Sequence, residues 1–261
     1  MIIDSHCHLD FPTLVKDRDG VIARARAAGL ARMVNISTNQ RTFDTVLSTA
    51  EAYSDVFCCF GIHPEHAGDE GEDLSVETIV QKTNHPKVIG LGETGLDYFR
   101  NTVPQDKQQQ SFRRHIQAAQ QTNLPVVIHS RAAEDDTLRV LKDEGSVQGV
   151  LHCFSSRRFL AEEGLKLGLY LSFSGILTFN KSEELRQIAR DIPMDRLLVE
   201  TDAPFLAPEP FRGKICEPAY VVKTAEVLAE VKRVSYDEIA AQTTENFFRL
   251  FKKCPKNSPE I

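Results

Sequence analysis

The chain has 261 residues, of which 31 are Lys or Arg and 37 are Asp or Glu, so its formal net charge at pH 7 is −6. Proteins that coat duplex nucleic acid without sequence preference are usually basic, and this charge argues against that class. Hydrophobic residues make up 41% of the chain, which is ordinary for a globular protein, and no apolar run is long enough to span a bilayer.

Eight short apolar and β-branched runs predict strands, at 2–8, 32–38, 56–63, 87–93, 125–130, 149–154, 168–174 and 197–202. Helical patterns separate them, at 16–28, 41–53, 75–83, 105–122, 132–144, 157–166 and 182–191, and two more follow at 218–232 and 235–252. This alternation predicts a parallel sheet with right-handed crossovers, and eight units favour a closed (β/α)8 TIM barrel over an open sheet. We therefore expect one α/β domain over residues 1–253, followed by a frayed tail over 254–261.

The start of the chain has no basic and apolar regions of the kind that make a signal peptide. Its six cysteines include no CxxC pair, so reduced thiols fit better than disulfides. These features predict a cytoplasmic protein with no membrane contact, and no feature points to an obligate protein partner.

Histidines and acids gather at the predicted C-terminal ends of the strands. His6 and His8 are two residues apart on the first strand, so they should share its inner side while Cys7 faces the helices. Later strands end in further metal-competent side chains, namely His63, Glu93, His129, His152 and Asp202. One such histidine is as often structural as functional, but the joint pattern predicts a metal site, because barrel enzymes keep their chemistry at these strand ends.

The stretches that carry these residues resemble a known family. DSHCHLD, GIHP, GETGLDYF, HSR, LHCFS and ETDAPFLAP…RGK are similar, in content and order, to the motifs of the TatD-type metal-dependent deoxyribonucleases of the amidohydrolase superfamily. The similarity runs from residue 2 to about residue 250. The sequence departs from the family pattern at Thr94, at Ser155-Ser156 and at Cys216, none of which removes a ligand.

The resemblance implies a site with two divalent metal ions. One ion would be held by His6, His8 and Asp202, the other by His129 and His152, and Glu93 would bridge them. It also implies hydrolysis of DNA phosphodiester bonds by a water that the two ions activate, with Asp202 as its general base. A shared carboxylate would reduce the repulsion between two cations. The identity of the metal stays open among Zn, Mn, Fe, Ni and Mg.

Cationic side chains near the strand ends predict contacts with DNA. They are Arg131, Arg157, Arg158, Arg212 and Lys214, and they would form a local basic collar on an acidic protein. His63 could donate a hydrogen bond to a phosphate oxygen or orient a ligand. The alternatives are solvated surface charge for the Arg and Lys side chains, and for His63 a rim histidine that bonds a loop. Phe99, Phe154 and Phe205 could stack on bases, although Phe154 also fits a core position.

Two further acids lie close to the expected ligands. Asp97, in the loop after the fourth strand, is expected to cap or brace that loop. Glu200, two residues before Asp202, fits two roles equally well, either orienting a ligand or lying in the barrel core.

The leading hypothesis is a two-metal phosphodiesterase acting on single-stranded or end-bound DNA. The same constellation could support a hydrolase or deaminase of a small amide, lactone or nucleobase, and a third reading is a metal-binding scaffold without catalysis. The cationic rim and the family-wide motifs favour DNA, and the complete ligand set argues against the scaffold.

Overall fold

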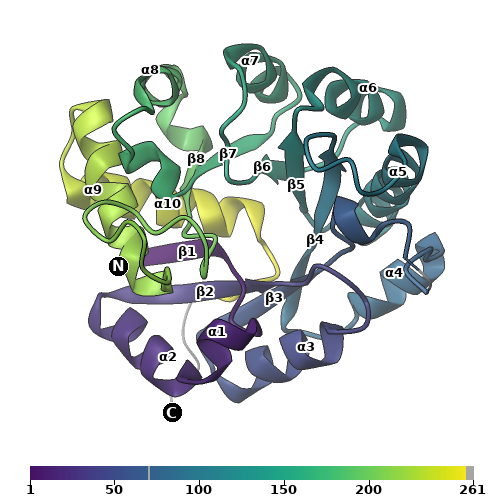
Figure 1. Cartoon of the computed structure of the whole chain (residues 1–261), viewed down its shortest axis with the longest axis horizontal. Helices are drawn as coiled ribbons and strands as arrows, with labels where there is room; N and C mark the ends of the chain where they lie inside the picture. The colour runs from purple at the N-terminus through teal and green to yellow at the C-terminus, as the bar shows by residue number, and fades with distance from the viewer. Residues whose placement is uncertain (70, 257–261) are drawn as a thin grey trace.

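The computed structural model describes residues 1–69 and 71–256 of the chain. Its eight strands form one parallel sheet whose order follows the chain (Figure 1). They are β1 Ile2–Cys7, β2 Leu30–Ile36, β3 Val56–Phe60, β4 Val88–Asp97, β5 Val126–Arg131, β6 Gly149–Leu151, β7 Tyr170–Phe173 and β8 Leu197–Val199. The sheet curls into a nearly closed barrel, because a parallel bridge joins Cys7 to Ala203, just after β8. The predicted TIM barrel is confirmed.

Helices surround the barrel and connect successive strands (Figure 1). They are α1 Pro12–Val15, α2 Arg18–Ala27, α3 Phe43–Ala52, α4 Val76–Lys82, α5 Gln105–Thr122, α6 Glu134–Glu144, α7 Arg158–Lys166, α8 Glu183–Asp191, α9 Val221–Lys232 and α10 Tyr236–Leu250. Local signals set several boundaries. Ser235 begins α10 with a capping box to Glu238, and α5 ends where Asn123 takes a left-handed conformation.

The strand boundaries differ from expectation mainly at the C-terminal ends. β4 continues to Asp97, while β6 and β8 stop at Leu151 and Val199, three residues earlier than predicted. The early stops have a backbone reason. Cys153 and Asp202 have φ values of 44° and 60°, in the left-handed region, where a strand cannot continue. These turns present the residues after each strand to the end of the barrel.

The apolar core has two layers. The outer layer lies between strands and helices and includes Ile2, Cys7 and Met33. The inner layer fills the barrel with residues from the early parts of the strands, such as Ile3 and Ile89, and with Phe247, Leu250 and Phe251 from the end of the chain. Helix α10 therefore closes the N-terminal end of the barrel (Figure 1), and the functional site can open only at the opposite end.

The first strand carries an irregularity that matters for the site. Ile3 faces the barrel interior and Cys7 faces the helices, although four residues of regular strand would put both on one side. The register with β2 shifts between Asp4 and Cys7, which is where the alternation reverses. His6 and His8 point to the site as predicted, but they do so because of this bulge and not through simple alternation.

The predicted tail at 254–261 lies mostly outside the described residues. Cys254 is buried against the inner layer, and residues 257–261 are not described. Over the ranges given above, no helix combines the length and apolarity needed to cross a membrane.

Candidate metal centre

A cavity of about 530 Å³ opens at the C-terminal end of the barrel, and five of the six predicted ligands line it, while His6 is buried next to His8. His6 and His8 come from the end of β1, Glu93 from β4, and His129 from β5. The remaining two, His152 and Asp202, follow the early ends of β6 and β8. His6, His8, Glu93 and His152 are each less than 10% exposed, so the cluster lies below the rim.

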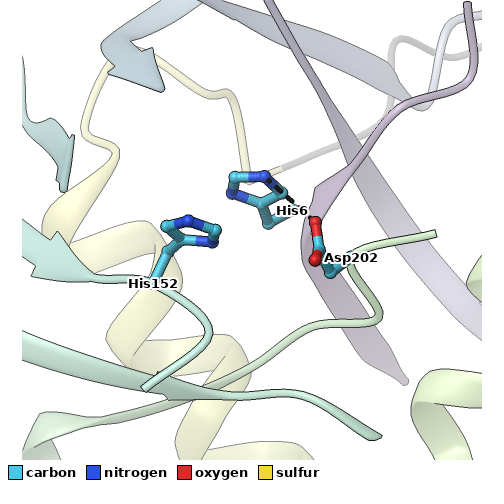
Figure 2. A group of neighbouring side chains, drawn as sticks. All are labelled: His6, His152 and Asp202. Atoms are coloured by element: carbon cyan, nitrogen blue, oxygen red, sulfur yellow. Dashed lines mark ion pairs between the residues drawn. The ribbon is translucent and has the colours of Figure 1, made fainter. Parts of the chain in front are cut away.

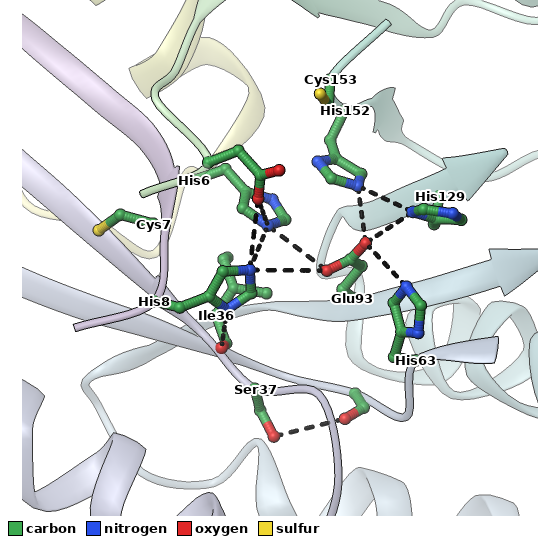
Figure 3. Close-up of polar contacts among 12 residues, drawn as sticks. His6, Cys7, His8, Ile36, Ser37, His63, Glu93, His129, His152 and Cys153 are labelled. Carbon is green, nitrogen blue, oxygen red and sulfur yellow. Dashed lines mark hydrogen bonds and ion pairs between the residues drawn. The ribbon is translucent and has the colours of Figure 1, made fainter. Parts of the chain in front are cut away.

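Glu93 lies at the centre of the cluster, and its two oxygens face different neighbours (Figure 3). Oε2 lies 3.5 Å from His6 Nε2 and 3.9 Å from His8 Nε2. Oε1 lies 2.8 Å from His129 Nδ1 and 2.7 Å from His152 Nε2. A carboxylate placed in this way can contribute one oxygen to each of two neighbouring metal positions.

The donor atoms fall into two halves around Glu93. In the first half, Asp202 Oδ1 lies 3.6 Å from His6 Nε2 and 3.4 Å from His8 Nε2. In the second half, His129 Nδ1 lies 3.3 Å from His152 Nε2. The halves adjoin, because the rings of His6 and His152 stack with centroids 4.0 Å apart (Figure 2).

Hydrogen-bond acceptors outside the cluster orient His8 and His152. The Nδ1 of His8 lies 3.0 Å from the carbonyl oxygen of Ile36, so a proton on Nδ1 leaves the Nε2 lone pair directed into the site. In the same way, His152 Nδ1 lies 3.2 Å from Glu200 Oε1. Of the two roles proposed for Glu200, its contact with His152 supports the orienting one.

Asp97 has a role that the sequence did not reveal. Its Oδ1 accepts hydrogen bonds from the backbone N–H groups of Phe99 and Arg100, both at 2.9 Å, which confirms that it caps the loop. Its Oδ2 lies 3.3 Å from His129 Nε2, which leaves the Nδ1 lone pair of His129 directed at the cluster. One carboxylate thus orients a ligand and holds the adjacent loop.

His63 lies beside the second half of the cluster. Its Nε2 is 3.5 Å from Glu93 Oε1, and its Nδ1 accepts a hydrogen bond from the backbone N–H of Glu65 at 3.2 Å. Burial lowers the pKa of His63 to about 3, so the ring is neutral and carries its proton on Nε2. In that form His63 can donate a hydrogen bond into the cavity.

The charges of the cluster suit a cation. Burial alone would raise the pKa of Glu93, but the charge of His152 and hydrogen bonds from His129 and His152 hold that pKa well below its ordinary value. The imidazoles of His8 and His6 similarly outweigh burial at Asp202 and lower its pKa. Both carboxylates are therefore ionised at neutral pH.

Nitrogen and oxygen donors converge closely enough to hold a metal. Three groups each bring three donor atoms within 4.8 Å of one another, namely His6–His152–Asp202, His6–His8–Glu93 and His63–Glu93–His129. Imidazole and carboxylate are the ligands that divalent transition metals prefer, so the residues present fit such ions.

Known proteins that resemble the chain over nearly its whole length show its family. The model of the family described as TatD related DNase matches residues 3–252. The chain belongs to the TatD family. It is 41% identical over 254 residues to the uncharacterized metal-dependent hydrolase YabD of Bacillus subtilis (strain 168), covering 97% of this chain and 99% of that protein. It is 43% identical over 256 residues to the uncharacterized metal-dependent hydrolase YcfH of Escherichia coli (strain K12), covering 96% of this chain and 95% of that protein.

A solved structure of the family has the same fold. The crystal structure of YjjV, a TatD homologue from Escherichia coli K12, superposes with a TM-score of 0.90 at 31% identity, covering 97% of this chain and 98% of that one. This TatD-family chain is accordingly a metal-dependent hydrolase, and its His, Glu and Asp groups are those that could bind the metal.

The predicted basic collar of the TatD-family barrel divides into two groups. Arg131 lines the cavity, with its guanidinium 4.0 Å from the ring centroid of Phe99. Four residues of the collar, Arg157, Arg158, Arg212 and Lys214, are not among the cavity-lining residues. Arg157 pairs with Glu134 at 3.4 Å, Arg158 with Asp191 at 2.6 Å, Arg212 lies 3.7 Å from the Phe179 ring, and Lys214 lies 5.5 Å from the Phe211 ring. Contact between these four and a substrate stays a prediction.

Sequence reasoning missed two residues of this TatD-family site. Arg100 and His66 both line the cavity, and Arg100 pairs with Glu65 at 2.8 Å. Arg100 directly follows the GETGLDYF stretch and His66 follows GIHP, so their place beside strand-end motifs was the available signal. Phe154 is buried and packs against Phe173, which confirms its core role.

Proposed function

We propose that this TatD-family hydrolase is a deoxyribonuclease that cleaves phosphodiester bonds of single-stranded or end-bound DNA with two divalent metal ions. The observation that carries the proposal is the central position of Glu93, whose two oxygens face two separate sets of donors. A pair of divalent ions is a recurrent device for displacement at phosphorus, because both the attacking and the leaving oxygen need stabilisation.

The ligand assignment follows the two halves of the cluster. His6, His8 and Asp202 would hold one ion, His129 and His152 the other, and Glu93 both. The chemistry that such ions supply when bound is Lewis acidity toward a phosphoryl oxygen and a lower pKa for water. Their identity among Zn, Mn, Fe, Ni and Mg is not fixed by these donors.

The protein's own residues then divide the remaining tasks. Asp202 is ionised, and its side chain is 16% exposed to the cavity, so it can accept the proton of the attacking water. His63 offers its Nε2 proton to a phosphoryl oxygen, because Nδ1 is already engaged by Glu65. Asp97 and Glu200 keep His129 and His152 in the tautomers that ligation requires.

The cavity wall supports a nucleic-acid substrate. The Arg131 guanidinium lies over the Phe99 ring, 4.0 Å from its centroid, and its N–H groups can make a bidentate contact with a phosphate. Arg100 lines the same cavity. Four carboxylates, Glu65, Glu93, Asp97 and Asp202, line it too, so the positive charge that attracts an anionic polymer would come from these two guanidinium groups together with the bound metal ions.

The test is hydrolysis by protein reconstituted with each candidate metal. End-labelled single-stranded and double-stranded DNA should be cleaved, while a matched panel of small amides, lactones and nucleobases should not be turned over. Glu93→Gln is the control, because it keeps the size of the side chain and removes the shared charge. Turnover of a small amide or nucleobase, with no cleavage of DNA under any metal, would contradict the proposal and favour an amidohydrolase-type or deaminase activity.

A further inference from the structure

Two aromatic rings stand in the cavity, each three residues after a ligand of the first half of the cluster. Phe11 follows His8, and its backbone N–H donates to the His8 carbonyl oxygen at 3.2 Å. Phe205 follows Asp202, and its N–H donates to the Asp202 carbonyl oxygen at 2.9 Å. These two turns tie the position of each ring to a ligand of the same metal position.

The rings form one continuous wall. The Phe11 ring lies 4.8 Å from the His8 ring at an interplanar angle of 29°, and Phe205 meets Phe11 edge to face at 5.7 Å. Ile176 and Leu206 extend the apolar lining on this side of the cavity. Phe205 is nevertheless 50% exposed. A ring that served only to shield His8 would be buried, so a free aromatic surface is left facing the cavity.

The other side of the cavity has opposite chemistry. Arg131 and Arg100 line it next to His129 of the second half, and Arg100 is paired with Glu65 at 2.8 Å. The cavity thus offers an aromatic surface beside one half of the cluster and two guanidinium groups beside the other. A nucleotide has the same asymmetry, since a flat apolar base lies one sugar away from an anionic backbone.

We propose that Phe11 and Phe205 form a stacking platform for a nucleobase, that of the nucleotide on the His6–His8–Asp202 side of the scissile phosphate. This inference rests on the proposed function and assigns the side chains that would hold one base of the DNA substrate. The platform accepts any base, because each has a π face, and stacking on an aromatic side chain contributes a factor of roughly 5 to 150 in affinity.

The test compares thymidine dinucleotides with analogues in which a tetrahydrofuran replaces one nucleoside, on either side of the phosphate. For the wild-type protein, loss of the base on one particular side should lower kcat/KM by roughly 5- to 150-fold. Phe205→Ala should lower kcat/KM for the full dinucleotide by a similar factor and leave that analogue unaffected. Phe205→Tyr should retain the preference. Phe159→Ala, which removes an exposed ring on α7 outside the cavity lining, should change nothing.

If Phe205→Ala lowers kcat/KM equally for the full dinucleotide and for both analogues, the stacking-platform proposal is wrong, while the proposed phosphodiesterase activity still stands. If no dinucleotide is cleaved at all, the proposed function fails, and a binding measurement still decides the platform. Zn²⁺-loaded protein should quench the fluorescence of 2-aminopurine deoxyriboside 5′-monophosphate by stacking. Quenching should be lost in Phe205→Ala and kept in Phe159→Ala, and absence of quenching, or quenching that survives Phe205→Ala, would refute the inference.

Discussion

Replacing Asp202 by Asn tests the first half of the metal centre most directly. The change keeps the shape of the side chain and removes the negative charge that faces His8 at 3.4 Å and His6 at 3.6 Å. Loss of general-base help alone typically costs ~10²- to 10⁴-fold in rate, and loss of a ligand adds to that. We expect DNA hydrolysis with excess metal to fall by at least that factor, while the barrel stays folded on its apolar layers.

The same variant has a second, pH-dependent effect in metal-free protein. Burial would lower the pKa of His8, but the hydrogen-bonded Asp202 carboxylate outweighs burial and raises that pKa from 6.5 to about 9. A pKa that is higher in the folded state stabilises the fold fully below pH 6.5, and this contribution is lost as the pH rises toward 9. The difference between the two pKa values of His8 corresponds to roughly 3 kcal/mol of unfolding free energy below pH 6.5.

Chemical denaturation in the presence of a chelator measures this contribution. Between pH 6.5 and 9 the unfolding free energy of the Asp202→Asn protein should fall less steeply than that of the wild type. Asp191→Asn is a matched control, because it removes an exposed carboxylate from a surface pair with Arg158. An unchanged pH slope in Asp202→Asn would show that Asp202 does not hold the charge on His8, and near-normal DNA hydrolysis would place the His6–His8 pair outside the catalytic site.

Three further outcomes are expected. Saturated wild-type protein should hold more than one equivalent of divalent metal by elemental analysis, and Glu93→Gln should hold less, since both halves lose an oxygen; a wild-type maximum of one equivalent would contradict the two-metal proposal. Arg131→Ala should weaken DNA turnover and flatten its salt dependence while sparing a small phosphodiester, with Arg249→Ala on α10, outside the cavity lining, as the control; equal losses on both substrates would mean that Arg131 supports the fold. Glu200→Leu should weaken metal affinity by ~10- to 100-fold in a chelator competition, whereas Glu200→Gln keeps an acceptor for His152 and should lose less; equal affinities in both variants would indicate that Glu200 only fills space.

The barrel and the seven metal-competent residues at its strand ends were accessible from the sequence, because strand periodicity and strand-end chemistry are both local properties, whereas the division into two ligand sets came from the family resemblance. His129 and His152, for example, each directly follow an apolar run, and the fold brings the ends of such runs together. Contacts between loops are not local in this sense. Nothing in the neighbourhood of Asp97 indicates that it reaches His129 on the next strand while capping its own loop.

The sequence also did not indicate in which direction long side chains point. Arg131 and Arg158 both lie near predicted strand ends, yet one lines the cavity and the other turns to an acid on α8. That choice depends on which carboxylate is within reach, which only the packing of the helices decides. The bulge in β1 could not be predicted from the sequence either, because a single shift of register leaves no signal in the composition of the strand.

The position of α10 has a consequence for the order in which the chain can complete its fold. All six expected ligands lie between residues 6 and 202, so they are synthesised before this helix, but the floor of the barrel is built from Phe247, Leu250 and Phe251. During synthesis, Ile3 and the other inward side chains lack their contacts with α10 at the N-terminal end of the barrel until residues 236–251 have left the ribosome. A nascent chain can therefore contain all the ligands of the metal centre before the barrel interior is filled. The barrel is complete only after α10 packs against its N-terminal end.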